Sequence, residues 1–331
     1  MILRRVRLAS ACILAACLAL PLGIVRVHAK DTTTQVTVRA GKQDNPNYPL
    51  VRQFSEALAL AANGTFALDV KESQGTVQNV IDAPKSSANT IFTASRSVIL
   101  QARHSRKPFV PNRGYYDIRA LFPIPAQTLH WVVRRDSGIQ SMADLAGHAF
   151  VPGAKGSVSE RVTASALQAL GIESKVQLID IDVAAAPDAV MSNKVSGLAM
   201  AGNFPIPRIA DIAKATQIRL LGLAPAVIAK MVAADDSIVP QAIPHGTYPG
   251  VDADVATVAV PAGIYATRRM SNDTAYALTK TFWSQIAALA GKNPAWRAVT
   301  AAAIPTLGIK LHPGALRYYN EAGIAVPAAM R

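Results

Sequence analysis

The stretch Ala149-Phe150-Val151-Pro152-Gly153-Ala154-Lys155-Gly156-Ser157-Val158-Ser159 runs from an apolar strand pattern through a glycine-containing loop into a helix pattern. Apolar residues recur at helical spacing from Ser157 to Leu170, and Val176 to Ile181 follows as the next predicted strand. A strand, a helix and a strand in this order are typical of a parallel βαβ unit. This stretch therefore predicts an α/β fold.

The same alternation extends outward along the chain. Gln35 to Ala40 and Phe66 to Val70 are predicted strands, and Val51 to Ala62 is the helix between them. Other predicted strands are 129–133, 198–201, 218–221 and 255–260. Residues 77–81 are the predicted start of another helix, and further predicted helices span 184–193, 272–289 and 313–322. The length of 331 residues suggests two domains or one large one. We expect parallel sheets with helices on both faces.

The N-terminal segment has the composition of a secretion signal. Arg4, Arg5 and Arg7 precede an apolar run from Leu8 to Val25, and the segment ends with the small residue Ala29. We expect cleavage after Ala29, which would give a soluble periplasmic chain. The formal charge of +13 would then fall to +9, because four arginines lie in the removed segment. Such a charge could serve an anionic surface, but export and the lack of a binding motif argue against nucleic acid.

A lipoprotein is the alternative form of export. Leu14-Ala15-Ala16-Cys17 could be a lipoprotein cleavage box, which would leave Cys17 acylated and the protein anchored to a membrane. The residues after Cys17 stay apolar as far as Val25, whereas a polar tether would be expected there. The sequence therefore favours the soluble form.

Catalytic and metal-binding patterns are missing from the sequence beyond the signal. Both cysteines, Cys12 and Cys17, lie inside the signal, so thiol catalysis, disulfides and thiolate metal sites are excluded for the processed chain. No two of its histidines have the i, i+4 spacing of a helical metal pair, and no nucleophile elbow or Walker loop occurs. We expect no enzyme activity, no metal and no cofactor.

Two polar loops lead into predicted helices. Gly153 to Ser159 follows one predicted strand, and Ser73 to Thr76 follows another. Free backbone N–H groups at a helix start, together with hydroxyls and Lys155, suit a carboxylate or a phosphate. A plain capped turn, in which Ser157 bonds only to its own helix, is the other interpretation. Ligands in open α/β sheets bind beyond the carboxyl ends of the strands, so two such loops favour a binding site.

Several segments together resemble one receptor family. They are Leu129 to Ile139 with Asp144-Leu145-Ala146-Gly147, Gly156 to Glu160, Gly202 to Pro207, Gly246-Thr247-Tyr248-Pro249-Gly250 with Asp252, Asp254 and Thr257 to Val260, and Leu311 to Ala315 with Tyr318-Tyr319. These segments resemble the TAXI-type solute receptors of TRAP transporters, and the resemblance covers nearly the whole processed chain.

The resemblance implies a periplasmic-binding-protein-like fold of type II, with two α/β lobes joined by crossing hinge strands. We expect one lobe from residues 32–127 plus 255–331 and the other from 128–254, with Leu129 to Arg134 and the segment around Gly246 to Val251 crossing between them. The implied function is capture of a solute between the lobes and its delivery to a TRAP-type membrane permease. A component that signals to a sensor kinase or chemoreceptor is the alternative.

Candidate ligand-binding residues follow from the loops and from the resemblance. They are Gly41, Lys42, Gln43, Asn45, Asn47, Tyr48, Ser73, Gln74, Gly75, Thr76, Asn79, Ser95, Arg96, Lys155, Gly156, Ser157, Ser159 and Asn203. The chain departs from the family pattern in the first loop, where only Gly41 remains of the usual glycines, and at Arg96, which replaces an acidic residue. The Arg96 fork suits a carboxylate, so we expect a small organic anion, a carboxylate or an acidic amino acid.

Overall fold

The strands of the protein form one mixed sheet. The computed structural model describes residues 33–43, 48–182 and 184–331. The expected signal 1–29 with Cys17, and the candidate residues Asn45 and Asn47, lie outside the described residues.

Within the described ranges the sheet has the order β2-β1-β3-β10-β4-β7-β5-β6, with β8 also beside β4 and β9 beside β10. The strands are β1 (Thr34–Arg39), β2 (Phe66–Lys71), β3 (Thr90–Ser95), β4 (Ile118–Arg134), β5 (Ala149–Val151), β6 (Gln177–Leu178), β7 (Gly197–Gly202), β8 (Ile218–Leu220), β9 (Val239–Ile243) and β10 (Val255–Thr267).

Helices connect most of these strands. The α-helices are α1 (Tyr48–Ala61), α2 (Thr76–Asp82), α3 (Arg96–Arg103), α4 (Val158–Leu170), α5 (Ala186–Met191), α6 (Pro207–Ala215), α7 (Pro225–Ala234), α8 (Asn272–Lys292) and α9 (Pro313–Glu321). Short 3-10 helices are η1 (Ala83–Lys85), η2 (Arg113–Asp117), η3 (Arg135–Ser137), η4 (Met142–Leu145), η5 (Glu173–Lys175), η6 (Pro294–Ala298), η7 (Ala301–Leu307) and η8 (Ala328–Met330). In the described part of the chain, no helix has both the length and the apolar composition needed to cross a membrane.

The first half of the chain confirms the predicted βαβ pattern. β1 pairs in parallel with β2 and with β3, and α1 and α2 are the connections between them. The buried face of α1 carries Phe54, whose ring meets the edges of Phe122 and Trp296. Phe122 also stacks on Phe282 of α8 with a centroid distance of 4.0 Å, so the C-terminal helix shares the core of the N-terminal strands.

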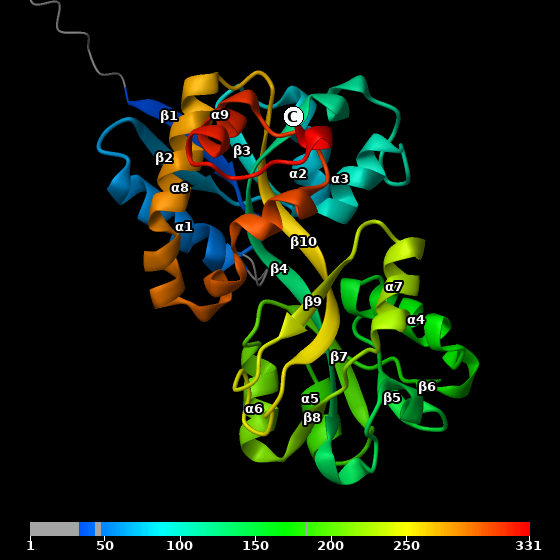
Figure 1. The fold of residues 1–331 in the computed structure, drawn as a ribbon. Coiled ribbons are helices and arrows are strands. Elements are labelled where there is room, and N and C mark those ends of the chain that lie inside the picture. Colours follow the sequence, from blue (N-terminus) through cyan, green and yellow to red (C-terminus); the bar gives the residue numbers. More distant parts are fainter. Residues whose placement is uncertain (1–32, 44–47, 183) are drawn as a thin grey trace, which may run out of the picture. The chain divides into compact units, whose positions relative to one another are not determined.

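β4 and β10 are the strands that run from one half of the structure to the other (Figure 1). They pair antiparallel from Ala259 opposite Thr128 to Thr267 opposite Ile118. β10 is also antiparallel to β3, so the sheet is mixed rather than purely parallel as expected. The crossing segment predicted at 246–251 does not form a strand, because these residues form turns and bends. Gly246 and Gly250 have φ of 72° and 81°, which interrupts any extended strand there.

Two of the three hydrophobic clusters of the described structure meet along these crossing strands. The first core includes Ile124 of β4 and resumes at Ala262 of β10. A second core includes Leu129 of β4 and reaches Val260 of β10. A third cluster lies on the α5 and α6 side of β7. The hydrophobic core therefore changes between Ile124 and Leu129 on one strand and between Val260 and Ala262 on the other. Together these features confirm the expected two-lobed α/β class.

The second half repeats the α/β arrangement with shorter strands. β5 pairs in parallel with β6 and β7, and β7 pairs antiparallel with β4. α4 lies against the sheet, where the indole N–H of Trp131 donates to the Thr163 hydroxyl at 2.9 Å. The strand predicted at Val176 to Ile181 is reduced to the two residues of β6, because only Ala149 and Phe150 of β5 pair with it.

Candidate functional site

A cavity of about 350 Å³ lies where the two halves of the structure face each other across β4 and β10. We call it the interlobe cleft. Its polar lining residues are Thr76, Thr93, Ser95, Ser97 and Gln101 from the first half, Gln127 from β4, and Gly156, Ser157 and Arg161 from the second half. Because both halves contribute polar groups, a molecule in this cavity would touch both.

Two helix starts border the cleft from opposite sides. α3 begins directly after Ser95, whose side chain makes no capping hydrogen bond. The Ser95 hydroxyl is instead within hydrogen-bond distance, 2.9 Å, of the Ser97 hydroxyl. α4 begins after Ser157, whose hydroxyl accepts from the Glu160 amide at 3.1 Å. N–H groups in the first turn of a helix have no intrahelical partner and carry positive partial charge, so these ends favour an anion.

Four of the residues chosen from the sequence line the cleft. They are Thr76, Ser95, Gly156 and Ser157. The capped-turn interpretation of Ser157 is correct for its hydroxyl, and the residue borders the cleft nevertheless. The local signal that identified Thr76, Gly156 and Ser157 was a polar loop between a strand and a helix, whereas Ser95 was chosen from the family resemblance.

Most other chosen residues do not line the cleft. The Gly41 carbonyl accepts from the Ser73 amide at 3.1 Å, which joins the first two loops. Tyr48 is half-buried and packs against the first core. The remaining residues of this group are Lys42, Gln43, Gln74, Gly75, Lys155 and Asn203, and none belongs to the cleft lining.

Asn79 and Ser159 are buried and bound to backbone. The Asn79 side-chain amide donates to the carbonyls of Arg39 and Thr93 at 3.3 and 3.1 Å, so it joins α2 to β1 and β3. The Ser159 hydroxyl accepts from the Ala201 amide at 2.9 Å. Neither residue lines the cleft. Sequence reasoning chose Ser159 from its polar loop and Asn79 from the family resemblance, and only the packing shows where their hydrogen bonds go.

Arg96 turns away from the cleft. Its Nη1 donates to the Thr306 carbonyl at 3.2 Å, and its guanidinium lies against Gly308, where an added Cβ would sit 2.8 Å from Nε. Arg96 is absent from the cleft lining, although its neighbours Ser95 and Ser97 belong to it. The structure therefore gives Arg96 a place against η7 and leaves the ligand-binding role expected for it as a prediction only.

Arg161 is the charged residue that does reach the cleft. Among the described residues that line this cavity it is the one charged side chain, and no acidic side chain accompanies it. Its Nη1 forms an ion pair with Asp235, which follows α7. The two side chains are 41% and 27% exposed, so the pair is only partly shielded from water. Sequence reasoning missed Arg161 because it lies inside a regular helix pattern with no motif around it.

One protein-family model matches most of the chain. The NMT1-like family model covers residues 40–323, which includes every element that borders the cleft. The chain belongs to the NMT1-like family. The TAXI resemblance found in the sequence is a finer assignment, and it stays a prediction.

Solved structures similar to this NMT1-like chain have the same fold at low sequence identity. A TctC solute-binding protein from Polaromonas has 11% identity and a TM-score of 0.53, over 83% of this chain and 88% of that one. MatC from Rhodopseudomonas palustris, solved with bound malate, has 11% identity and a TM-score of 0.51, over 87% of this chain and 98% of that one. The periplasmic binding protein BugD has 11% identity and a TM-score of 0.50, over 88% and 98%. The expected type II periplasmic-binding-protein fold is confirmed.

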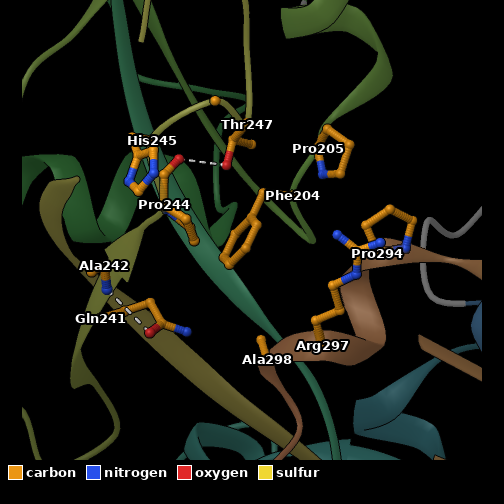
Figure 2. A pocket seen from close by; sticks show the side chains of 11 residues that line it. Phe204, Pro205, Gln241, Ala242, Pro244, His245, Thr247, Pro294, Arg297 and Ala298 are labelled. Carbon is orange, nitrogen blue, oxygen red and sulfur yellow. Dashed lines mark hydrogen bonds between the residues drawn. The ribbon is translucent and has the colours of Figure 1, made fainter. Parts of the chain in front are cut away.

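A second cavity in this NMT1-like protein has a volume of about 440 Å³ (Figure 2). Phe204, Pro205 and the 241–247 segment form one wall, and Pro294 and Arg297 of η6 form the other. Figure 2 shows Arg297 reaching past Pro294 towards Pro205. Two polar side chains of this second cavity already have hydrogen-bond partners within the protein. His245 Nδ1 lies 2.8 Å from the Asp254 carboxylate, and the Thr247 hydroxyl donates to the Pro244 carbonyl at 2.6 Å.

The segment around Tyr248 is joined by hydrogen bonds to the neighbouring loop that carries Ile206. The Tyr248 hydroxyl accepts from the Ile206 amide at 2.7 Å, and burial raises the pKa of Tyr248. The backbone and side-chain hydrogen bonds from His245 lower the pKa of the Asp254 carboxyl. These residues hold two loops together, which is a structural role.

In the described ranges, no group of three or more His, Cys, Asp or Glu side chains is placed to hold a metal ion. We take the interlobe cleft as the candidate functional site.

Proposed function

We propose that this NMT1-like protein is an extracytoplasmic receptor that captures a small organic anion in the interlobe cleft. The observation that carries the proposal is the lining of the cleft, where polar groups from both halves and two helix starts meet without an acidic side chain among the described residues. Such a site offers hydrogen-bond donors and positive potential. MatC, which shares the fold, was solved with malate, itself an organic anion.

The crossing strands β4 and β10 contain the proposed hinge about which the two lobes close. The core changes between Ile124 and Leu129 in β4 and between Val260 and Ala262 in β10, so we place the hinge there. A ligand that touches both lobes binds the closed form better than the open form, and this difference in affinity shifts the population towards closure. The lobes proposed from this hinge contain residues 33–124 with 262–331 and residues 129–260.

A TRAP-type permease is the proposed recipient of the ligand, as the TAXI resemblance implies. Co-purification of the tagged receptor with the permease, in the presence and absence of ligand, tests this step. Capture of a sensor kinase instead would favour the signalling alternative. Intact mass of the exported protein tests the proposed cleavage after Ala29. A mature chain that begins with acylated Cys17 would contradict it.

The cleft itself is tested by blocking it. Val77 lines the cleft in the first turn of α2 and is 36% exposed, so Val77→Trp adds bulk to the cavity without opening the core. Leu60 of α1 is 82% exposed and lines none of the cavities described above, and Leu60→Trp is the matched control.

The readout is titration calorimetry with organic acids, amino acids, sugars and polyamines. We expect at least one organic acid to bind the wild type and the Leu60→Trp variant with equal affinity. Val77→Trp should weaken that binding by about tenfold or more, or ~1.4 kcal/mol. Exclusive binding of sugars or polyamines, or equal binding by both tryptophan variants, would contradict the proposal.

A further inference from the structure

A larger polar cavity continues from the interlobe cleft. Its volume is about 580 Å³, and it shares the lining residues Ser97, Gln101 and Arg161 with the cleft. The rest of its wall includes Arg106 from the loop after α3, and Asp235 and Asp236 from the segment after α7. Arg161 is therefore placed where the two cavities meet, and its side chain is accessible from both.

The position of Arg161 in its helix is not explained by helix stability. Arg161 lies one turn from the start of α4, at the positive end of the helix dipole, where a cation is disfavoured. Its one recorded hydrogen bond runs from Nη1 to Asp235. The other guanidinium N–H groups have no recorded partner within the described residues. A planar fork of donors is thus left open at the junction of the two cavities.

Asp235 is fixed more firmly than an ordinary surface acid. One carboxylate oxygen accepts from the Ser237 amide at 2.9 Å, and the other meets Arg161. Burial alone would raise the pKa of the Asp235 carboxyl, but the hydrogen bonds from Ser237 and the charge of Arg161 hold the pKa below its usual value. The carboxylate is therefore ionised at neutral pH, and it holds one arm of the arginine fork in a defined direction.

We propose that Arg161 binds the anionic group of the solute and that Asp235 is the residue that positions Arg161 for this contact. The proposal rests on the proposed function and names the chemical class of ligand, a carboxylate whose two oxygens match two parallel N–H donors. Ser97 and Gln101 lie beside Arg161 in both cavities and supply neighbouring polar groups. Arg106 and Asp236 line only the larger cavity and do not reach the cleft in which the anionic group is bound.

The test compares carboxylic acids with their own amides. The processed full-length protein is titrated calorimetrically with pyruvate, lactate, malate and glutamate, and with the corresponding primary amides. The wild type should prefer at least one acid over its amide by about tenfold or more, because an amide lacks the charge that the fork recognises. Arg161→Ala should weaken binding of that acid by about 10- to 100-fold and leave the amide nearly unchanged. Arg161→Lys keeps the charge without the fork and should fall between the two.

Two further variants separate direct binding from general charge and from positioning. Arg106→Ala removes the same charge from the adjoining cavity and should change the affinity by less than about threefold, since water screens a distant charge. Asp235→Asn keeps one of the two acceptor oxygens, which can still accept from Arg161, and removes the negative charge that competes with the ligand, so the acid affinity should be kept or increased. Asp235→Ala removes this support and should bind the acid about fivefold more weakly than Asp235→Asn.

Each failure has a different signature. If the wild type binds none of these acids, the proposed function fails and this inference fails with it. If the wild type prefers an acid and Arg161→Ala keeps that preference, only the role of Arg161 is overturned. Equal losses in Arg106→Ala and Arg161→Ala would overturn direct contact, and equal affinities in the two Asp235 variants would overturn positioning.

Discussion

The hydroxyl of Ser159 accepts a hydrogen bond from the backbone amide of Ala201 at 2.9 Å. Ser159 lies in the first turn of α4, and Ala201 lies near the end of β7, so this bond ties the helix to the sheet beside the cleft. Gly153 allows the close approach, because a Cβ on Gly153 would lie 2.4 Å from the Ser159 Cβ. The loop that presents Gly156 and Ser157 to the cleft is therefore held in place by buried contacts of its neighbours.

Ser159→Ala tests the first of these contacts. The substitution leaves the partly buried Ala201 N–H without its acceptor, so we expect the free energy of unfolding to fall by ~1–2 kcal/mol. Urea denaturation measures the change. Ser174 is exposed and has no recorded hydrogen bond in the described structure, so Ser174→Ala should leave the midpoint unchanged. Equal stability of the two variants would show that the Ser159 bond contributes little.

Gly153→Ala tests the close approach. Gly153 has φ of +117°, and the added Cβ would collide with Ser159, so we expect a loss of at least ~1 kcal/mol. Gly291 lies near the end of α8 with no atom within 4 Å of its added Cβ, and Gly291→Ala should stabilise the protein by ~0.5–1 kcal/mol. The two alanine variants should shift the urea midpoint in opposite directions. A stabilised Gly153→Ala would refute the steric argument.

Two buried histidines predict a loss of stability in mild acid. Burial lowers the pKa of His130 and of His312 to about 4, so both are neutral in the folded protein at pH 6. The unfolded chain binds these protons near pH 6.5 and the folded chain does not, so stability falls as pH drops from about 6.5 towards 4. Each histidine contributes a slope of up to about 1.4 kcal/mol per pH unit in that window, and its contribution is complete above it.

The measurement is urea unfolding at pH 7.5 and pH 5 for the wild type and for His130→Gln and His312→Gln. Each variant should lose part of the difference between the two pH values, whatever its stability at pH 7.5. His312 donates or accepts at both ring nitrogens, towards the Met270 carbonyl and from the Gly314 amide, so His312→Gln should also be less stable at pH 7.5. An unchanged pH difference in both variants would contradict the assignment.

Arg96→Ala distinguishes a structural arginine from a ligand-binding one. The guanidinium supports η7 through the Thr306 carbonyl, so its loss should lower the free energy of unfolding by ~1 kcal/mol. The ratio of acid to amide affinity should stay at the wild-type value, because Arg96 does not line the cleft. Denaturation and calorimetry give the two readouts. A reduced ratio at normal stability would restore the ligand role expected from the sequence.

The order of strands and helices was determined by local patterns in the sequence. β1, α1 and β2 agree with the predicted 35–40, 51–62 and 66–70, since apolar spacing within each element reports the face that it buries. The length of β4 was missed, because Pro123 and Pro125 interrupt the strand pattern upstream of Leu129. A proline has no N–H to donate, and irregular pairing with β10 in this region accommodates it.

The parts of the cleft that the sequence determined are its loops. Thr76, Gly156 and Ser157 were identified because a polar loop that ends a strand and starts a helix is readable from neighbouring residues alone, and Ser95 was identified from the family resemblance. Which arginine reaches the cleft was decided only by the tertiary structure. Arg96 bonds a carbonyl 210 residues along the chain, and Arg161 meets an aspartate 74 residues away. Long flexible side chains take their direction from such distant partners, so no local pattern encodes where their charge lies.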